Sequence, residues 1–144
     1  MRVSGILNDK GADVATITSD RTLADAADEL RRLRIGALVV TDDGQRIEGM
    51  LSERDVVQAV ALFGHGVLAR PVSTAMSADV WTCSPEDSTE ELARSMTFHR
   101  TRHLPVTSEG RLVGIVSIGD IVKSRLDELE RERDQLTNYI TTGR

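Results

Sequence analysis

The chain has 144 residues and a formal charge of −5, a length that suits one compact domain or two small fused units. The acidic balance, with no long cluster of Lys and Arg, argues against a nucleic-acid backbone as a direct partner. No apolar run reaches the roughly 18 residues of a membrane span, no secretory leader is visible, and the single cysteine cannot form an internal disulfide. We therefore expect a cytoplasmic protein without membrane contact.

The first half of the chain predicts a short series of alternating elements. A lead-in at residues 3–7 precedes a β-prone run at 14–17. A helix follows, because Thr22 and Asp25 have capping-box spacing and the next apolar residues share one helical face. Strands at 36–40 and 46–51, joined by a turn at Asp43-Gly44, then lead into a second helix.

The second half repeats this order. A lead-in at 72–76 and a β-prone run at 80–83 precede a helix capped by Ser88 and Glu91, and strands at 102–106 and 112–116 flank a turn at 109–110. Gly44 corresponds to Gly110 and Gly49 to Gly114, so the second copy is shorter by a single position within its hairpin. One such unit cannot bury its sheet alone, so we expect the two copies to pack sheet to sheet. The predicted fold is α+β, with two pseudo-symmetric β-α-β-β-α units at 1–70 and 71–126 and an extended C-terminal helix.

The last helix carries its apolar pattern well past the end of its counterpart in the first copy. The pattern continues through Leu126, Leu129, Leu136 and Ile140, so we assign residues 127–144 to a C-terminal helical extension. Two interpretations of this extension stay open. It is either a core-packing helix with a frayed end or a contact between subunits.

Each copy ends its last strand with the motif Gly-x-x-Ser-x-x-Asp, which places Ser52 and Asp55, or Ser117 and Asp120, in the first turn of a helix. A helix N-terminus offers unpaired N–H groups and partial positive charge to a phosphate. The Ser hydroxyl can join those donors, and the Asp carboxylate can accept from a sugar diol. The alternative is a capping box, in which both side chains only satisfy the N–H groups of their own helix.

The remaining reactive residues do not form a catalytic or metal-binding pattern. Cys83, His65, His99 and His103 have no metal-ligand spacing, and no Ser lies in a nucleophile-elbow context. Gly114 and Gly119 have the outer spacing of a Walker motif, but Asp120 stands where that motif requires Lys. We expect no enzyme activity, no catalytic residues and no metal.

With its duplicated units, the strand Arg102-His103-Leu104-Pro105-Val106 and the two Gly-x-x-Ser-x-x-Asp corners, the chain resembles a tandem pair of cystathionine β-synthase (CBS) domains. The likeness covers roughly residues 3–126 and is to stand-alone bacterial members with no attached enzyme or channel. It implies a non-enzymatic regulatory module for signal transduction, acting as an energy or metabolite sensor. It also implies an adenosine-containing ligand, namely AMP, ADP, ATP, NAD(H) or S-adenosylmethionine, with AMP as the first candidate and no required cofactor.

The resemblance further implies two nucleotide sites, each made from the corner of one unit and the strand starts of the other. The first site would comprise Ser117, Ile118, Gly119, Asp120, Thr16, Ile17, Thr18, Gly36, Ala37 and Val39. The second site would comprise Ser52, Arg54, Asp55, Thr82, Cys83, Ser84, Arg102, His103 and Pro105. The two copies differ at Val39, which stands in place of proline, and at Ile118-Gly119, which replace Glu53-Arg54 and remove a cation near the phosphate.

CBS pairs usually associate as flat dimers, so the resemblance and the C-terminal apolar stripe together predict a homodimer. The helices after Asp55 and Asp120 would supply most of its contact. The regulated protein is not identified by the sequence. The alternative function is a dimeric structural or interaction scaffold that binds no small molecule and keeps the two corners only as helix caps.

Overall fold

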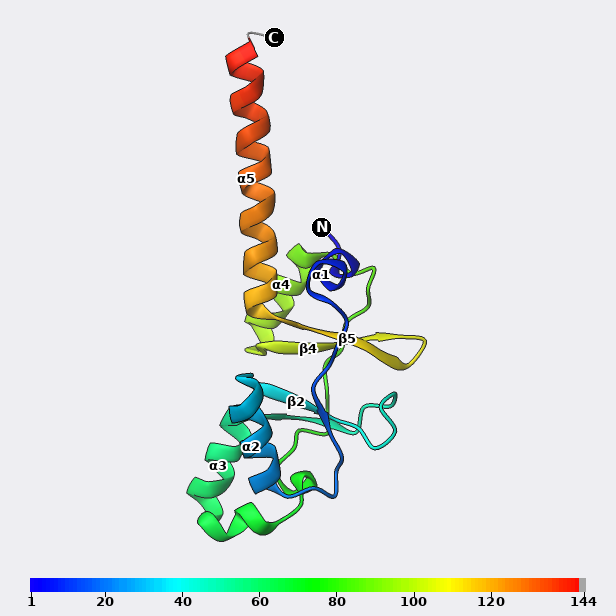
Figure 1. The fold of residues 1–144 in the computed structure, drawn as a ribbon, viewed down its shortest axis with the longest axis vertical. Coiled ribbons are helices and arrows are strands. Elements are labelled where there is room, and N and C mark those ends of the chain that lie inside the picture. The colour runs from blue at the N-terminus through cyan, green and yellow to red at the C-terminus, as the bar shows by residue number, and fades with distance from the viewer. Residues whose placement is uncertain (143–144) are drawn as a thin grey trace.

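The computed structural model describes residues 1–142 and shows two small sheets facing one another, with a helix pair on the outer side of each (Figure 1). The elements in chain order are α1 (Val3–Lys10), β1 (Thr16–Ile17), α2 (Leu23–Leu33), β2 (Ala37–Val40), β3 (Gly49–Ser52), α3 (Glu53–Phe63), the 3-10 helices η1 (His65–Ala69) and η2 (Val72–Thr74), α4 (Thr89–His99), β4 (His103–Ser108), β5 (Arg111–Ser117) and α5 (Ile118–Thr142). The predicted α+β fold of two repeated units with a long last helix is confirmed. No helix in this part of the chain is long and apolar enough to cross a bilayer.

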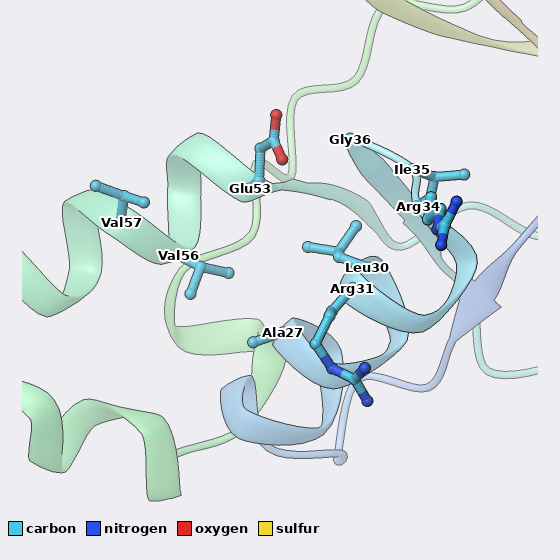
Figure 2. A pocket seen from close by; sticks show the side chains of 9 residues that line it. All are labelled: Ala27, Leu30, Arg31, Arg34, Ile35, Gly36, Glu53, Val56 and Val57. Carbon is cyan, nitrogen blue, oxygen red and sulfur yellow. The ribbon is translucent and has the colours of Figure 1, made fainter.

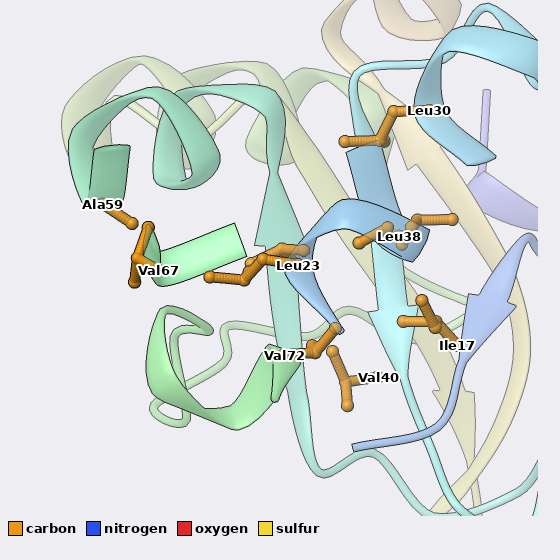
Figure 3. Packing of buried hydrophobic residues seen from close by; sticks show 10 residues of the cluster. Ile17, Leu23, Leu30, Leu38, Val40, Ala59, Val67 and Val72 are labelled. Atoms are coloured by element: carbon orange, nitrogen blue, oxygen red, sulfur yellow. The ribbon is translucent and has the colours of Figure 1, made fainter. Parts of the chain in front are cut away.

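The first unit is built on a three-stranded sheet in the order β1-β2-β3. β1 pairs parallel with β2, and β2 pairs antiparallel with β3. All four residues of β2 are buried, as expected for a central strand with a continuous apolar sequence. Leu23 and Leu38 are fully buried, and Leu30 also lies in the core between α2 and this sheet (Figure 3).

The second unit has a two-stranded sheet, because the strand predicted at 80–83 does not form. Only Cys83 pairs with β4, through a single bridge to Val106. The cause is Pro105. In the first unit the N–H of Val39 donates to Ala15 O at 3.1 Å, whereas Pro105, at the position equivalent to Val39, has no N–H to donate to Trp81.

The two lead-ins are exchanged between the units. Val3 and Ile6 of α1 are buried in the core of the second unit, and Val72 of η2 is buried in the core of the first. Gly114 lies against Leu7 and Gly49 lies against Met76, which are equivalent pairs in the two halves. The domain limits at 1–70 and 71–126 stay predictions. The side-chain packing does not follow them, because α1 packs in the core of the second unit.

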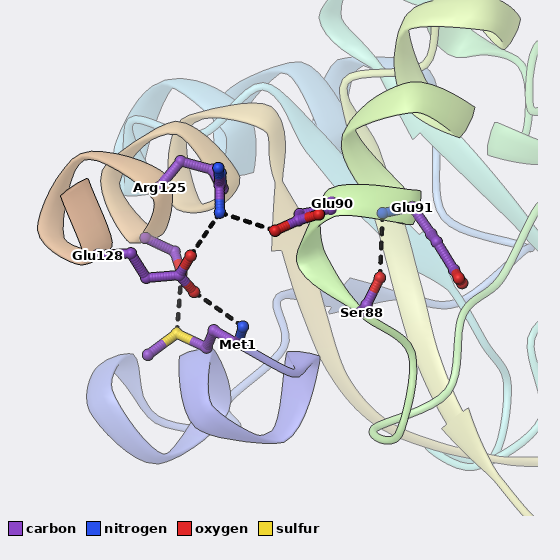
Figure 4. Close-up of polar contacts among 7 residues, drawn as sticks. Met1, Ser88, Glu90, Glu91, Arg125 and Glu128 are labelled. Carbon is purple, nitrogen blue, oxygen red and sulfur yellow. Dashed lines mark hydrogen bonds and ion pairs between the residues drawn. The ribbon is translucent and has the colours of Figure 1, made fainter. Parts of the chain in front are cut away.

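Helix α5 is anchored on the second unit along its first half (Figure 4), and its remainder projects away from the sheets (Figure 1). Arg125 bridges Glu90 and Glu128, and the amino group of Met1 lies 2.8 Å from Glu128 Oε1. Beyond Glu128 the helix continues intact to Thr142, with Leu129 50% exposed, Leu136 60% and Ile140 68%. The interpretation of the extension as a frayed core-packing helix is therefore wrong. Gly143 and Arg144, also part of the assigned extension, lie outside the described residues.

Candidate functional site

Both Gly-x-x-Ser-x-x-Asp corners form complete capping boxes. Ser52 N donates to Asp55 Oδ2 at 2.8 Å, and Asp55 N donates to Ser52 Oγ at 3.1 Å. The second corner repeats these bonds at 2.9 and 3.1 Å between Ser117 and Asp120. The capping interpretation is therefore correct as a description of local geometry, and it fixes both carboxylates in one orientation.

The first turn of each helix retains little unsatisfied donor capacity for an anion. Glu53 N donates to Gly36 O at 2.9 Å, and Ile118 N donates to Arg102 O at 2.8 Å. The third N–H of each helix donates to the Ser of its own corner. Among the first three N–H groups of each helix, only the second, that of Arg54 or Gly119, has no partner within residues 1–142. A phosphate at either corner needs additional donors or a cation.

The two predicted sites meet where β2 and β4 begin. A Cβ added at Gly36 would lie 3.2 Å from His103 Cε1 and 3.7 Å from Glu53 Oε1. Gly36, predicted for the first site, and His103, predicted for the second, are therefore neighbours. His103 also pairs with Ser117 across the β4–β5 ladder, which connects this point to the second corner.

The charges around His103 show which groups surround the junction. Burial of the imidazole lowers the pKa of His103 below its ordinary value, and Arg102 and Lys10 lower that pKa further. Glu53 and Asp120 act in the opposite direction on the same pKa without cancelling the shift. Charged groups from both units therefore act on one half-buried histidine.

Lys10 lies beside the second corner, a position that our sequence analysis missed. Its Nζ lies 2.7 Å from Asp120 Oδ2, with the two side chains 33% and 24% exposed. Burial alone would raise the pKa of Asp120, but the Lys10 ammonium and the Ser117 N–H outweigh it and hold that pKa below its ordinary value. No sequence signal connects positions 10 and 120, because the contact depends on the exchange of the lead-ins.

Several predicted site residues are placed with their side chains in the two cores. Val39 is fully buried, while Ile17 is 7% exposed and Ala37 and Cys83 are each 5% exposed. Burial, with a smaller effect of the Asp87 charge, raises the pKa of the Cys83 thiol to about 12. These residues can offer backbone atoms to a ligand, whereas their side chains serve the packing.

The predicted residues in the loops bond locally. Thr18 Oγ1 donates to Asp20 at 2.7 Å, and Ser84 N donates to Asp87 at 2.9 Å. Thr82 lines a shallow cavity of about 400 Å³ beside the β-hairpin loops. Arg54 and Arg102 flank the two corners, and Pro105 accepts a hydrogen bond from Cys83 N.

A larger cleft of about 550 Å³ opens between α2 and α3 (Figure 2). Leu30 and Val56 line it from the two helices, with Arg31 and Arg34 also on its wall. It shares Gly36 alone with the predicted sites and has Glu53 beside that residue. The cleft is therefore adjacent to the junction and overlaps the predicted nucleotide sites only at Gly36. Residues 1–142 contain no group of three or more His, Cys, Asp or Glu arranged to hold a metal.

Comparison with known proteins agrees with this architecture. The sequence matches the CBS domain over residues 3–62 and again over 72–127. It is 30% identical to the CBS domain-containing protein YhcV of Bacillus subtilis, over 94% of this chain and 95% of that protein. The crystal structure of the CBS-domain protein ATU1752 from Agrobacterium tumefaciens has a TM-score of 0.84 and 44% identity, over 87% of this chain and 99% of that one.

A further similar structure contains ligands. The CBS domain pair of protein MJ0100, solved in complex with 5′-methylthioadenosine and S-adenosyl-L-methionine, has a TM-score of 0.71 and 25% identity, over 88% of this chain and 98% of that one. Two successive matches to one family, on two units that share an antiparallel hairpin, the corner motif and the lead-in contacts, account for nearly the whole chain. The chain belongs to the CBS domain family and contains a tandem pair of these domains.

Proposed function

We propose that this protein is a regulatory module that binds an adenosine-containing ligand between its two CBS units. The observation that carries the proposal is the pair of matched corners, each with a carboxylate fixed at the start of a helix. The Asp120 corner is linked through His103 to Gly36 of the other unit, so a ligand there would contact both units. The complex of MJ0100 with two adenosine compounds supports this ligand class.

Capping and ligand binding are compatible at these corners. Each box uses Oδ2 of its aspartate, and the hydrogen bonds within residues 1–142 leave Oδ1 of Asp55 and Asp120 without a donor. A carboxylate oxygen has capacity for more than one hydrogen bond, so a ribose diol can donate to Oδ1 while the cap persists. We assign the ribose to these carboxylates and the remaining predicted residues to the walls of the two sites.

Asp55→Asn and Asp120→Asn test the proposal against the capping-only alternative. Asn is a good capping residue, so each change should cost about 1 kcal/mol of stability or less. Loss of charge-assisted bonds to the ribose, worth about 1.5–3 kcal/mol, should weaken ligand binding by roughly 10- to 100-fold. Calorimetry with AMP, ATP, NAD and S-adenosylmethionine measures the affinity, and a thermal-shift panel should show a rise of about 5–10 °C for a saturating ligand.

Asp25→Asn is the matched control, because Asp25 forms the same capping box with Thr22 away from both corners. It should leave the ligand affinity unchanged. The alternative, a scaffold without a small-molecule ligand, is favoured by the closed capping boxes. That alternative would hold if the panel gave no thermal shift at millimolar concentrations, or if the double corner variant bound as tightly as the unmodified chain.

We also propose that the protein is a homodimer joined through α3 and α5. Val57 is 66% exposed, Leu62 76%, Phe63 68% and Val122 50%, and the exposed stripe of α5 continues beyond them. Apolar side chains gathered on two helices favour association with a second copy. Light scattering should give twice the chain mass, and Val57→Glu should shift the distribution toward monomer. A monomer at every concentration would contradict the assembly without affecting the ligand assignment.

A further inference from the structure

We propose that Lys10 makes the Asp120 corner selective for adenosine ligands that carry a phosphate. The inference rests on the proposed function, because it concerns what that corner accepts. Its basis is the ion pair between Lys10 Nζ and Asp120 Oδ2 at 2.7 Å. This pair places a cation beside the corner whose own first turn, Ile118-Gly119-Asp120, contains none.

The backbone of Lys10 is held in place, while its ammonium group retains freedom to move. Val3 and Ile6 are buried in the second core, and Leu7 packs against Gly114, so α1 is fixed on the unit that contains Asp120. Lys10 is the last residue of α1, and its side chain is 33% exposed. A long flexible stem on a fixed helix end can transfer its ammonium from the carboxylate to a neighbouring anion.

The first corner has no equivalent of this lysine. In the alignment of the two lead-ins that pairs Val3 with Val72, Lys10 corresponds to Asp79. Asp79 lines the cavity beside the hairpin loops rather than the Asp55 corner, because the chain after η2 runs along β3 through a bridge between Ser77 and Met50. The first turn of α3 has two acidic residues, Glu53 and Asp55, and only Arg54 as a cation. The two corners thus share their capping boxes and differ in the cation.

The chemistry follows from two partners that share one carboxylate, Lys10 at Oδ2 and a ribose at Oδ1. Without ligand, Lys10 neutralises Asp120. A ribose that donates to this carboxylate weakens the ion pair, and a phosphate compensates by giving the ammonium a new charged partner. An uncharged 5′ group offers no such partner. S-adenosylmethionine has at its 5′ position a sulfonium cation, which repels the ammonium, and its carboxylate lies several bonds beyond the place of a 5′-phosphate. The Asp120 corner should therefore prefer AMP to adenosine, 5′-methylthioadenosine or S-adenosylmethionine.

The test compares AMP and adenosine by calorimetry in an Asp55→Asn background, which leaves the Asp120 corner as the binding site. Lys10→Gln should lower the affinity for AMP by about 10- to 100-fold, the usual effect of losing a charge-assisted bond. The same change should alter the affinity for adenosine by less than about threefold. Lys10→Arg should retain the preference for AMP. Lys123→Gln, which removes the other lysine of the chain at an exposed position on α5, should change neither affinity.

The outcomes separate this inference from the proposed function. Equal weakening of AMP and adenosine by Lys10→Gln, or no effect on either, would overturn the selectivity while leaving the proposed function intact. Binding of AMP by the unmodified chain but by no Asp55→Asn variant would place the ligand at the other corner and also overturn it. If the unmodified chain binds no adenosine compound, both proposals fail.

Discussion

The two CBS units share their corners and helix caps, but they support those corners differently. In the first unit β2 is covered by strands on both sides, and the lead-in that packs on it is the three-residue 3-10 helix η2. In the second unit one strand is reduced to a single bridge, and the eight-residue helix α1 packs on the sheet instead. The duplicated motif therefore preserves the capping geometry of both corners. The charged groups beside each corner, and the helix that packs on each sheet, are determined by neighbouring segments.

The largest expected loss of stability comes from truncating buried side chains, and it shows whether the two units unfold together. Leu51 and Val116 are equivalent and fully buried, and Leu51→Ala should cost about 2–5 kcal/mol, more than Val116→Ala at about 2 kcal/mol. Because the lead-ins are exchanged, we expect one transition in urea for each variant. Circular dichroism and the fluorescence of Trp81, the only tryptophan, should report the same midpoint. Separate midpoints in Leu51→Ala would show that the exchange does not couple the units.

A smaller effect should distinguish the two lead-in contacts. A Cβ at Gly49 would lie 2.7 Å from the backbone oxygen of Ser77, whereas at Gly114 it would lie 2.7 Å from the end of the Leu7 side chain. Overpacking costs about 1–3 kcal/mol, and we expect Gly49→Ala at the top of that range and Gly114→Ala at the bottom, because a leucine side chain can move aside. Urea denaturation measures both. A larger loss of stability for Gly114→Ala than for Gly49→Ala would mean that α1 is held more rigidly against its sheet than the segment around Ser77.

The smallest expected effect concerns pH at the junction. The pKa of His103 in the folded protein lies below its value of about 6.5 in the unfolded chain, so the folded state binds fewer protons there. Its contribution to the free energy of unfolding is complete above pH 6.5 and is lost as the pH falls through the folded pKa. His103→Gln should flatten this part of the stability profile. The first unit has Ala37 at the equivalent position and adds no such dependence.

The sequence was sufficient for the repeated features and insufficient for contacts between distant segments. The motif spacing and the apolar patterns predict the helices, the hairpins and most of the caps, because these depend on neighbours within a few residues. At the fourth helix only Ser88 caps, because it accepts from Glu91 N without a bond in return from the Glu91 side chain. The absence of the strand at 80–83 could also have been predicted from the sequence. Pro105 has no N–H, so it removes one of the hydrogen bonds that would pair this strand with its neighbour. No sequence pattern predicted the position of Lys10, because its place beside Asp120 depends on which unit α1 packs against. The members of the two nucleotide sites stay predictions.

The free part of α5 has a mechanical consequence. The helix begins at the Asp120 corner, and its final stretch, from Leu129 to Thr142, projects past the contacts of Arg125 and Glu128. At a rise of about 1.5 Å per residue this stretch is about 21 Å long, and its exposed apolar stripe travels with it. A tilt of this stretch by about 10° about the contacts of Glu128 would displace the tip by roughly 4 Å. A tilt of α5 at the corner would therefore become a larger translation at the far end of the helix.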